Sequence, residues 1–357
     1  MTDATSAPAA GWSDPGPVAV APGIHRIALP MPEDGLRAVN VYAIEDGQGL
    51  TMIDGGWAVP EARAALEKAL DQLGYGLSGV SRFLVTHAHR DHYTLAVLLR
   101  REFGMTIGLG VGERATLAAL TRGAITNRFA AQVSLLRQAG AGELASLIAD
   151  GDSRVDPLPE GWEEPDEWLG AGTVRVADRT LRILPTPGHT QGHIVFADQA
   201  AGLLFAGDHV LPHITPSIGF EAVPSDAPLS DYLDSLALIR ALPDLTLLPA
   251  HGSVAASTHA RVDELVAHHD ARLRETGEAV AALGSADAAQ VAEALGWTRR
   301  RHSFASLDPF NQMLAVTETV AHLRLLVAAG LLAAAGDDVV SYRPAVPVPP
   351  AVPVPPA

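Results

Sequence analysis

Short strand-like runs that end abruptly in turn residues recur along roughly the first 250 positions of the chain. The run at 83–85, Phe-Leu-Val, leads directly into THAHRDH at 86–92. Three later runs, at 181–184, 203–206 and 245–248, lead into PTPGHT, GD and PAHG. Apolar runs of this length that are bounded by turn residues are typical of strands. We therefore expect four strand ends, each of which presents one or more polar side chains.

Helical periodicity fills the stretches between these strands. At 60–73 a proline suits the first turn, alanine and leucine form one apolar stripe, and Gly74 can end the helix. Further helices are expected at 113–121, 127–139, 143–149, 229–242, 258–275, 287–295 and 308–330. Opening strands are expected at 24–29, 39–44 and 50–53. Strands that alternate with helices favour a layered α/β fold.

Composition divides the chain into segments. The Ala/Pro/Gly-rich residues 1–20 are expected to be disordered, and residues 21–278 are expected to form a large domain. Residues 112–172 in that domain are interpreted as a helical insertion. Residues 279–343 are expected to form a smaller domain, and residues 344–357, which repeat PAVPVPP, an extended tail.

The insertion has two interpretations. It could cover the mouth of a site and supply apolar walls, with Phe129, Leu135, Leu136 and Trp162 as candidates. Alternatively, these side chains only pack the insertion onto the scaffold, since apolar stripes on helices usually belong to a core. The sequence leaves both interpretations open.

The loop at 86–92 carries His87, His89, Asp91 and His92. In an extended segment, His87 and His89 point to the same side and can bind one cation. Asp91 and His92 fall on the next turn and can bind a second. Neutral imidazole and carboxylate suit a borderline ion such as zinc, and burying this set without a cation would leave polar groups without partners. The loop therefore predicts a two-metal site.

The motifs THAHRDH, PGHT, GD and PAHG, in this order over residues 20–275, resemble those of the metallo-β-lactamase superfamily. The resemblance implies an α/β fold, an αββα sandwich, with two divalent ions. Zn²⁺ is the expected ion, and Fe or Mn remains open. The implied ligands are His87, His89 and His189 for one ion, Asp91, His92 and His251 for the other, and Asp208 as a bridge between them.

Three residues receive further roles. Asp54 matches an early aspartate of the family that orients the metal loop without binding metal, and a plain turn role in Asp-Gly-Gly is its alternative. Asp91 and Asp208 are candidate catalytic residues, with Asp91 as a proton shuttle. His213, which follows the Asp208 turn, is a candidate substrate contact or proton donor, and a loop histidine without a role is its alternative.

The C-terminal pattern consists of helix, helix and a hairpin around Gly336-Asp337-Asp338. Together with Thr317, Glu318, Ala321 and His322, it resembles the winged-helix appendage of a β-lactamase-like subfamily. Winged helices often bind DNA, but the second helix carries few basic residues. We therefore interpret this domain as a packing or dimerisation module.

Charge and cysteine content exclude several classes of function. The net charge of −16 disfavours binding to a phosphate backbone, so a nucleic-acid partner is not expected. The absence of cysteine excludes disulfides, cysteine zinc sites and a cysteine nucleophile. No secretory signal or membrane span is expected, so the prediction is a cytoplasmic protein with a small-molecule substrate, and a homodimer remains open.

Three functions remain as hypotheses. The favoured one is a dinuclear metal-dependent hydrolase that attacks an ester, thioester or lactone carbonyl with a metal-bridging hydroxide. The alternatives are a phosphodiesterase or single-strand ribonuclease of the same fold, and an iron-bound redox member. The fold alone cannot choose between them, because one fold hosts many chemistries.

Overall fold

The computed structural model describes residues 11–32, 34–47, 49–121, 129–152, 161–298 and 300–345. The chain divides into two compact units. The first consists of Met1–Ala131 and Gly151–Ala267, and the second of Gln132–Asp150 and His268–Ala357.

Among the described residues, seven strands of the first unit form one sheet in the order β1 to β7. Their bounds are β1 Pro17–Ala21, β2 Ile24–Pro30, β3 Ala38–Asp46, β4 Gly49–Ile53, β5 Val80–Val85, β6 Thr106–Gly110 and β7 Glu167–Leu169. The pairs from β1 to β4 are antiparallel, and those from β4 to β7 are parallel. Residues 1–20 were expected to be disordered, which is wrong for the part that forms β1. The backbone of β1 forms hydrogen bonds with β2, and such pairing does not depend on an Ala/Pro/Gly-rich composition. Residues 1–10 lie outside the described residues.

A second sheet of the first unit has the order β12-β11-β10-β9-β8. Its strands are β8 Gly172–Val176, β9 Arg179–Pro185, β10 Ile194–Asp198, β11 Leu203–Gly207 and β12 Thr246–Pro249. Only the pair β11 and β12 is parallel among these described strands. The two sheets share one core, in which Tyr42 meets Phe205 edge to face at 5.3 Å between ring centroids.

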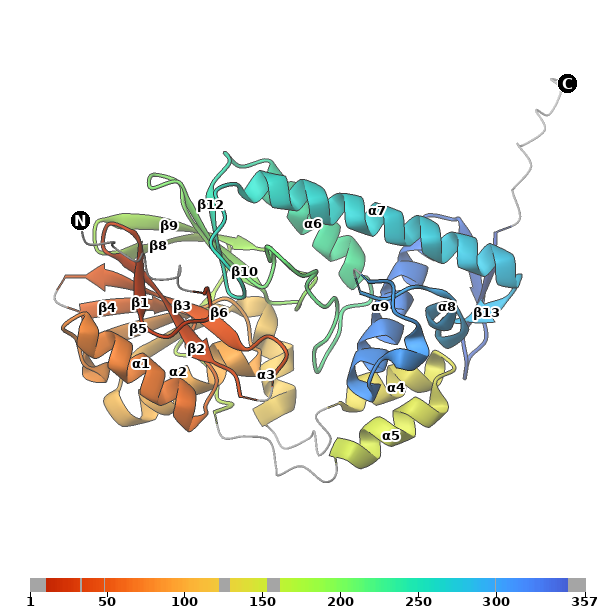
Figure 1. Ribbon diagram of the computed structural model, residues 1–357, viewed down its shortest axis with the longest axis horizontal. Coiled ribbons are helices and arrows are strands. Elements are labelled where there is room, and N and C mark those ends of the chain that lie inside the picture. The colour runs from red at the N-terminus through yellow and green to blue at the C-terminus, as the bar shows by residue number, and fades with distance from the viewer. Residues whose placement is uncertain are drawn as a thin grey trace, which may run out of the picture. The chain divides into compact units, whose positions relative to one another are not determined.

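Helices cover the outer faces of these sheets. The helices α1 (Pro60–Gln72) and α2 (Arg90–Phe103) lie against the first sheet, where Leu66 and Leu99 join its buried core. The helix α6 (Pro228–Arg240) and the start of α7 (Thr258–Leu283) lie on the outer side of the second sheet (Figure 1). This helix–sheet–sheet–helix order confirms the predicted αββα sandwich. Short 3₁₀ turns occur at η1 (Leu77–Gly79), η2 (Val111–Glu113) and η3 (Phe304–Ser306).

The expected helical insertion at 112–172 is divided between the units. The helix α3 (Arg114–Thr121) belongs to the first unit, whereas most of α4 (Ala130–Gln138) and α5 (Gly142–Asp152) belongs to the second. The insertion is also not purely helical, because β7 extends the first sheet by parallel pairing with β6. The first two residues of the helix expected at 127–139 lie outside the described residues.

The second unit contains α4, α5, the end of α7 and the C-terminal elements. The latter are β13 (Ala286–Asp287), α8 (Ala288–Ala294), α9 (Pro309–Ala328), β14 (Leu332–Ala335) and β15 (Ser341–Pro344), with sheet order β13-β15-β14. Backbone hydrogen bonds from Ala289 to Ala139 and from Val340 to Gln138, both 2.9 Å, join the two parts of this unit. The C-terminal part of the unit therefore begins at His268 within α7, and not at the expected residue 279. Residues 346–357 of the expected tail lie outside the described residues.

No helix in the described part of the chain combines the length and the apolar character that a membrane crossing requires.

The end of β6 packs against the loop that follows PGHT with no room for a side chain. A Cβ atom on Gly110 would lie 2.0 Å from the carbonyl oxygen of Gly192 and 3.1 Å from Ile194. We predict that Gly110→Ala lowers the free energy of unfolding by about 1–3 kcal/mol, because the backbone must move to accept the methyl group. Guanidinium denaturation measures this change. Gly142→Ala, where a Cβ meets open space, is the matched control, and equal stability of both variants would contradict this packing.

Candidate metal centre

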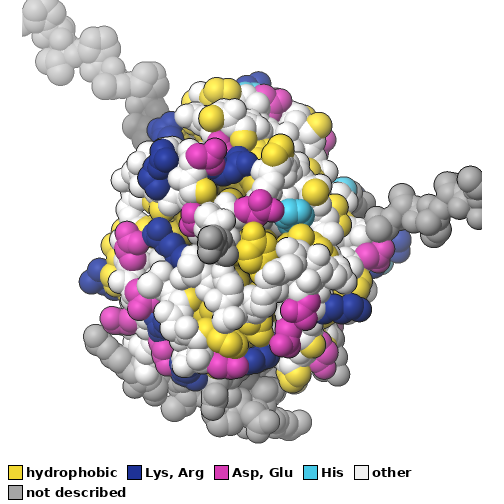
Figure 2. All heavy atoms as spheres, turned by 90° about the vertical axis from the view of Figure 1, so that its left-hand side faces the viewer, with side chains coloured by type: hydrophobic (Ala, Val, Ile, Leu, Met, Phe, Trp, Pro, Cys, Tyr) yellow, Lys and Arg dark blue, Asp and Glu magenta, His cyan; other side chains and the backbone are white. Residues whose placement is uncertain are grey.

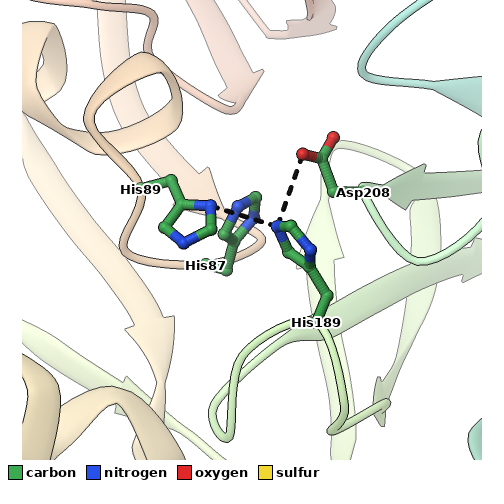
Figure 3. A group of neighbouring side chains, drawn as sticks. All are labelled: His87, His89, His189 and Asp208. Atoms are coloured by element: carbon green, nitrogen blue, oxygen red, sulfur yellow. Dashed lines mark hydrogen bonds and ion pairs between the residues drawn. The ribbon is translucent and has the colours of Figure 1, made fainter. Parts of the chain in front are cut away.

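Four strand ends bring the seven predicted ligands together, five of them in loops and two, Asp91 and His92, in the first turn of α2. His87, His89, Asp91 and His92 follow β5, and His189, Asp208 and His251 follow β9, β11 and β12. They form two groups in which the candidate ligand atoms lie within 4.8 Å of one another. One group is His87, His89, His189 and Asp208 (Figure 3), and the other is Asp91, His92 and His251. Each group could hold a metal ion.

Asp208 faces both groups. Its Oδ2 lies 3.5 Å from His189 Nε2, whereas its Oδ1 lies 3.5 Å from His251 Nε2 and 3.7 Å from His92 Nε2. A carboxylate whose two oxygens point to different groups has the geometry that a bridge between two ions needs.

Each histidine of the two groups has its other ring nitrogen held by the protein. This arrangement fixes the ring and its tautomer, so the remaining nitrogen is available to an ion. The holding contacts are His87 Nδ1 with Thr86 Oγ1 (3.1 Å), His89 Nε2 with the Phe220 carbonyl (2.9 Å), His92 Nδ1 with Asp54 Oδ2 (3.0 Å), His189 Nδ1 with the Ser217 carbonyl (2.7 Å) and His251 Nδ1 with the Ala38 carbonyl (2.8 Å).

Whether a metal ion fits this site can be judged from the buried polar atoms of the ligands. Among the described residues, Nε2 of His87, His92 and His251 and Oδ1 of Asp208 are buried without a hydrogen-bond partner. Buried polar atoms are normally paired, and these four are nitrogen and carboxylate donors of the kind that zinc takes. The donor set therefore fits bound metal ions.

Burial and charge prepare the rings for ligation. Burial lowers the pKa of His87 and of His189, so both stay neutral, which is the form that binds metal. Burial would also lower the pKa of His92 and of His251, but neighbouring carboxylates raise it: Asp91, Asp54 and Asp208 at His92, and Asp208 and Asp91 at His251. The rings of His92 and His251 therefore hold a proton more strongly than an ordinary histidine does.

Asp54 lies outside both groups and organises the metal loop. Its Oδ1 accepts hydrogen bonds from the Thr86 backbone N–H (2.8 Å) and hydroxyl (3.0 Å), while its Oδ2 faces His92 Nδ1. Its φ of 61° is in the left-handed region, which aspartate tolerates better than most residues. Asp54 therefore fits both earlier interpretations: it adopts a turn conformation, and it contacts the metal loop.

Two buried residues of the outer layer were not predicted from the sequence. His193 accepts a hydrogen bond from the Asp208 backbone N–H at 3.1 Å and lies 2.8 Å from the Thr186 hydroxyl through Nδ1. Asn40 donates from Nδ2 to the carbonyls of Pro249 (3.0 Å) and Gly252 (2.9 Å), on either side of His251. The position of His193, four residues after His189, could have marked it as a residue of the site. No local pattern marks Asn40, because its partners are more than 200 residues away in the sequence.

His213 does not join either group. Its side chain is exposed and lies beside Gly252, where a Cβ would be 3.3 Å from His213 Cδ2. No hydrogen bond connects it to a ligand among the described residues, so its catalytic role stays a prediction.

The four apolar residues that were candidates for lining the mouth of the site lie in different surroundings. Phe129 lies 6.1 Å from Phe220 between ring centroids, and Phe220 lies 6.3 Å from the ring of His89. Trp162 instead packs against the core of the first unit and stacks on Tyr93, while Leu136 is buried within α4. Leu135 lines a cavity of about 240 Å³ in the second unit with residues of α9. Only Phe129 therefore lies in an aromatic group that reaches the metal centre.

Loss of the Asp54 carboxylate should weaken metal binding. We predict that Asp54→Asn lowers zinc affinity by about 10- to 100-fold, because His92 and Thr86 lose the group that orients them. Competition with a chromophoric chelator measures the affinity. Asp71→Asn, an exposed position in α1, is the control, and an unchanged affinity in Asp54→Asn would contradict the orienting role.

Metal binding should also weaken as the pH falls. Because the carboxylates of Asp91 and Asp208 raise the pKa of His92 and His251, a metal must displace protons from these rings, and lower pH favours the protonated, metal-free form. Calorimetric zinc titrations between about pH 8 and pH 5 test this expectation. An affinity that stays constant over this range would contradict it.

Comparisons with known proteins agree with this geometry. Residues 34–251, more than half of the chain, match the sequence profile of the metallo-beta-lactamase superfamily. The chain is 26% identical over 234 residues to the atrochrysone carboxyl ACP thioesterase of Aspergillus fumigatus, which covers 65% of this chain and 42% of the thioesterase. It is 26% identical over 248 residues to the probable metallo-hydrolase YqjP of Bacillus subtilis, covering 63% of this chain and 70% of that protein. The chain spans about half the length of the first curated relatives it matches.

A solved structure is similar over a longer stretch. The metallo-beta-lactamase family protein TTHA1429 from Thermus thermophilus has a TM-score of 0.74 and 29% identity, over 91% of this chain and 100% of that chain. The sandwich, the two groups of ligand-type side chains and the profile match all point to the same family. The chain belongs to the metallo-β-lactamase superfamily.

Proposed function

We propose that this chain is a hydrolase that uses two divalent ions, with zinc favoured over iron or manganese, to cleave an ester, thioester or lactone. The family and the thioesterase and metallo-hydrolase relatives support a metal-dependent hydrolase. The observation that carries the dinuclear form is the Asp208 carboxylate, whose oxygens face one histidine group each. When bound, two such ions activate water at neutral pH and polarise a substrate carbonyl.

The side chains of the centre then have distinct tasks. Asp91 Oδ2 lies 3.3 Å from His251 Nε2 and 3.5 Å from His92 Nε2. Burial would raise the pKa of Asp91, but these two rings hold it well below its usual range. In this proposal the Asp91 carboxylate accepts the proton of the attacking water and delivers it to the leaving group.

An apolar surface beside the centre favours an acyl substrate. Phe220 lies next to His89, the one partly exposed member of its group, and Phe129 extends this aromatic surface. An acyl chain or ring that packs there would bring its carbonyl towards His89. These contacts support a small, partly apolar substrate.

The charge distribution gives no support to the alternative of a phosphodiesterase or ribonuclease. Basic and acidic side chains are interspersed on the face shown in Figure 2. In the second unit, Arg272 and Arg301 both pair with Glu275, at 3.1 and 2.8 Å. The winged-helix-like arrangement of α8, α9 and the β13-β15-β14 sheet is accordingly proposed as a packing or dimerisation module.

Removal of a predicted ligand should abolish turnover. We predict that His87→Ala lowers the rate of hydrolysis by more than roughly 100-fold, because an ion loses a direct ligand. Loss of a residue that only orients a ligand typically costs roughly 10- to 100-fold. The assay uses a p-nitrophenyl ester, an acyl-CoA thioester and a lactone, with bis-p-nitrophenyl phosphate and single-stranded RNA as tests of the alternative. His302→Ala, an exposed histidine of the second unit, is the control. Unchanged carbonyl turnover in His87→Ala would contradict the proposal, and cleavage of only phosphate esters would favour the alternative.

A further inference from the structure

A short irregular segment, residues 217–223, holds two ligands of the first metal group at once. The carbonyl of Ser217 accepts a hydrogen bond from His189 Nδ1 at 2.7 Å, and the carbonyl of Phe220 lies 2.9 Å from His89 Nε2. These contacts leave His189 Nε2 and His89 Nδ1 facing each other at 3.0 Å. The position of this segment, which we call the strap, therefore sets the distance between two ligand atoms.

The strap belongs to no helix or strand, so other contacts must fix it. Both carboxyl oxygens of Glu221 lie 3.1 Å from the backbone nitrogen of Gln191, which donates to them. The side chain of Gln191 donates in turn to the carbonyl of Val223 at 2.6 Å. Glu221 thus ties the strap to the loop that carries His189.

A second buried carboxyl, that of Glu113, holds the same His189 loop one residue earlier, at Thr190. Glu113 is fully buried, and its Oε1 accepts a hydrogen bond from the Thr190 hydroxyl at 2.5 Å. The backbone of Ala88, between the ligands His87 and His89, also interacts with this carboxyl, because it lowers the pKa of Glu113 against the effect of burial. The Thr116 hydroxyl donates to Glu221 Oε2 at 3.3 Å, so α3, which follows Glu113 directly, also contacts the strap residue.

We propose that Glu113 and Glu221 are positioning residues of the metal centre, which fix the strap and the two ligand loops so that His89 and His189 converge on one ion. This inference rests on the proposed metal centre. Neither residue contacts an ion in this assignment, and each acts through its hydrogen-bond partners. Burial raises the pKa of Glu113 to about 7, and burial together with the charge of Glu113 raises that of Glu221 to about 8. A neutral amide is therefore a close substitute for the carboxyl group of Glu221.

Metal binding by four proteins tests this role: the parent chain, Glu221→Ala, Glu221→Gln and the exposed control Glu67→Ala. Affinity is measured by chelator competition, and ligand geometry by the visible absorption of the Co²⁺-substituted protein. We expect Glu221→Ala to lower the affinity for one of two ions by about 10- to 100-fold and to change the Co²⁺ spectrum. Glu221→Gln should restore most of the affinity, and Glu67→Ala should match the parent.

A folded Glu221→Ala protein with the parent affinity and spectrum would overturn the positioning role. If Glu221→Ala does not fold, Thr190→Val decides, because it removes only the hydroxyl that Glu113 accepts from. Weaker binding in Thr190→Val supports the role, and parent-like binding overturns it. A parent chain that binds no metal would instead overturn the proposed function itself.

Discussion

The buried ligand atoms that lack hydrogen-bond partners are the constraint on which the rest of this site depends. Burial removes water from imidazole nitrogens and from a carboxylate, which costs free energy unless another partner replaces the water. Among the described residues these atoms come from the ends of β5, β11 and β12 and converge on the space around Asp208. Cations in that space would compensate all of them together.

The remaining layers of the fold hold those atoms in place. Asp54 at the end of β4 holds His92, the backbone at Ala38 and the side chain of Asn40 hold the loop of His251, and the strap holds His89 and His189. These partners come from strands β3 and β4 of the first sheet and from an irregular loop, whereas the ligands His189 and His251 follow strands of the second sheet. The geometry of the centre is therefore a property of the packed sandwich, and the loop at 86–92 alone could not produce it.

The four ligand-bearing strands, the opening strands β2 to β4, most helices and all seven residues of the two groups could be predicted from local patterns. An apolar run followed by a turn with histidine or aspartate is visible over ten residues. Contacts between distant segments could not be predicted. The backbone carbonyls of the strap, Glu113 and Glu221 have no local signature. The same reason explains the misplaced insertion, since the partners of α4 lie near residues 289 and 340. It also explains the missed strands β1, β6, β7, β8 and β10, whose pairing depends on neighbouring strands.

Anomalous X-ray scattering at the zinc edge, from crystals grown with zinc, tests the central claim most directly. The dinuclear centre predicts two peaks about 3.5–4 Å apart. One should contact His87, His89 and His189, the other Asp91, His92 and His251, and Asp208 should contact both. A single peak, or no peak among these residues in crystals of the folded chain, would contradict it.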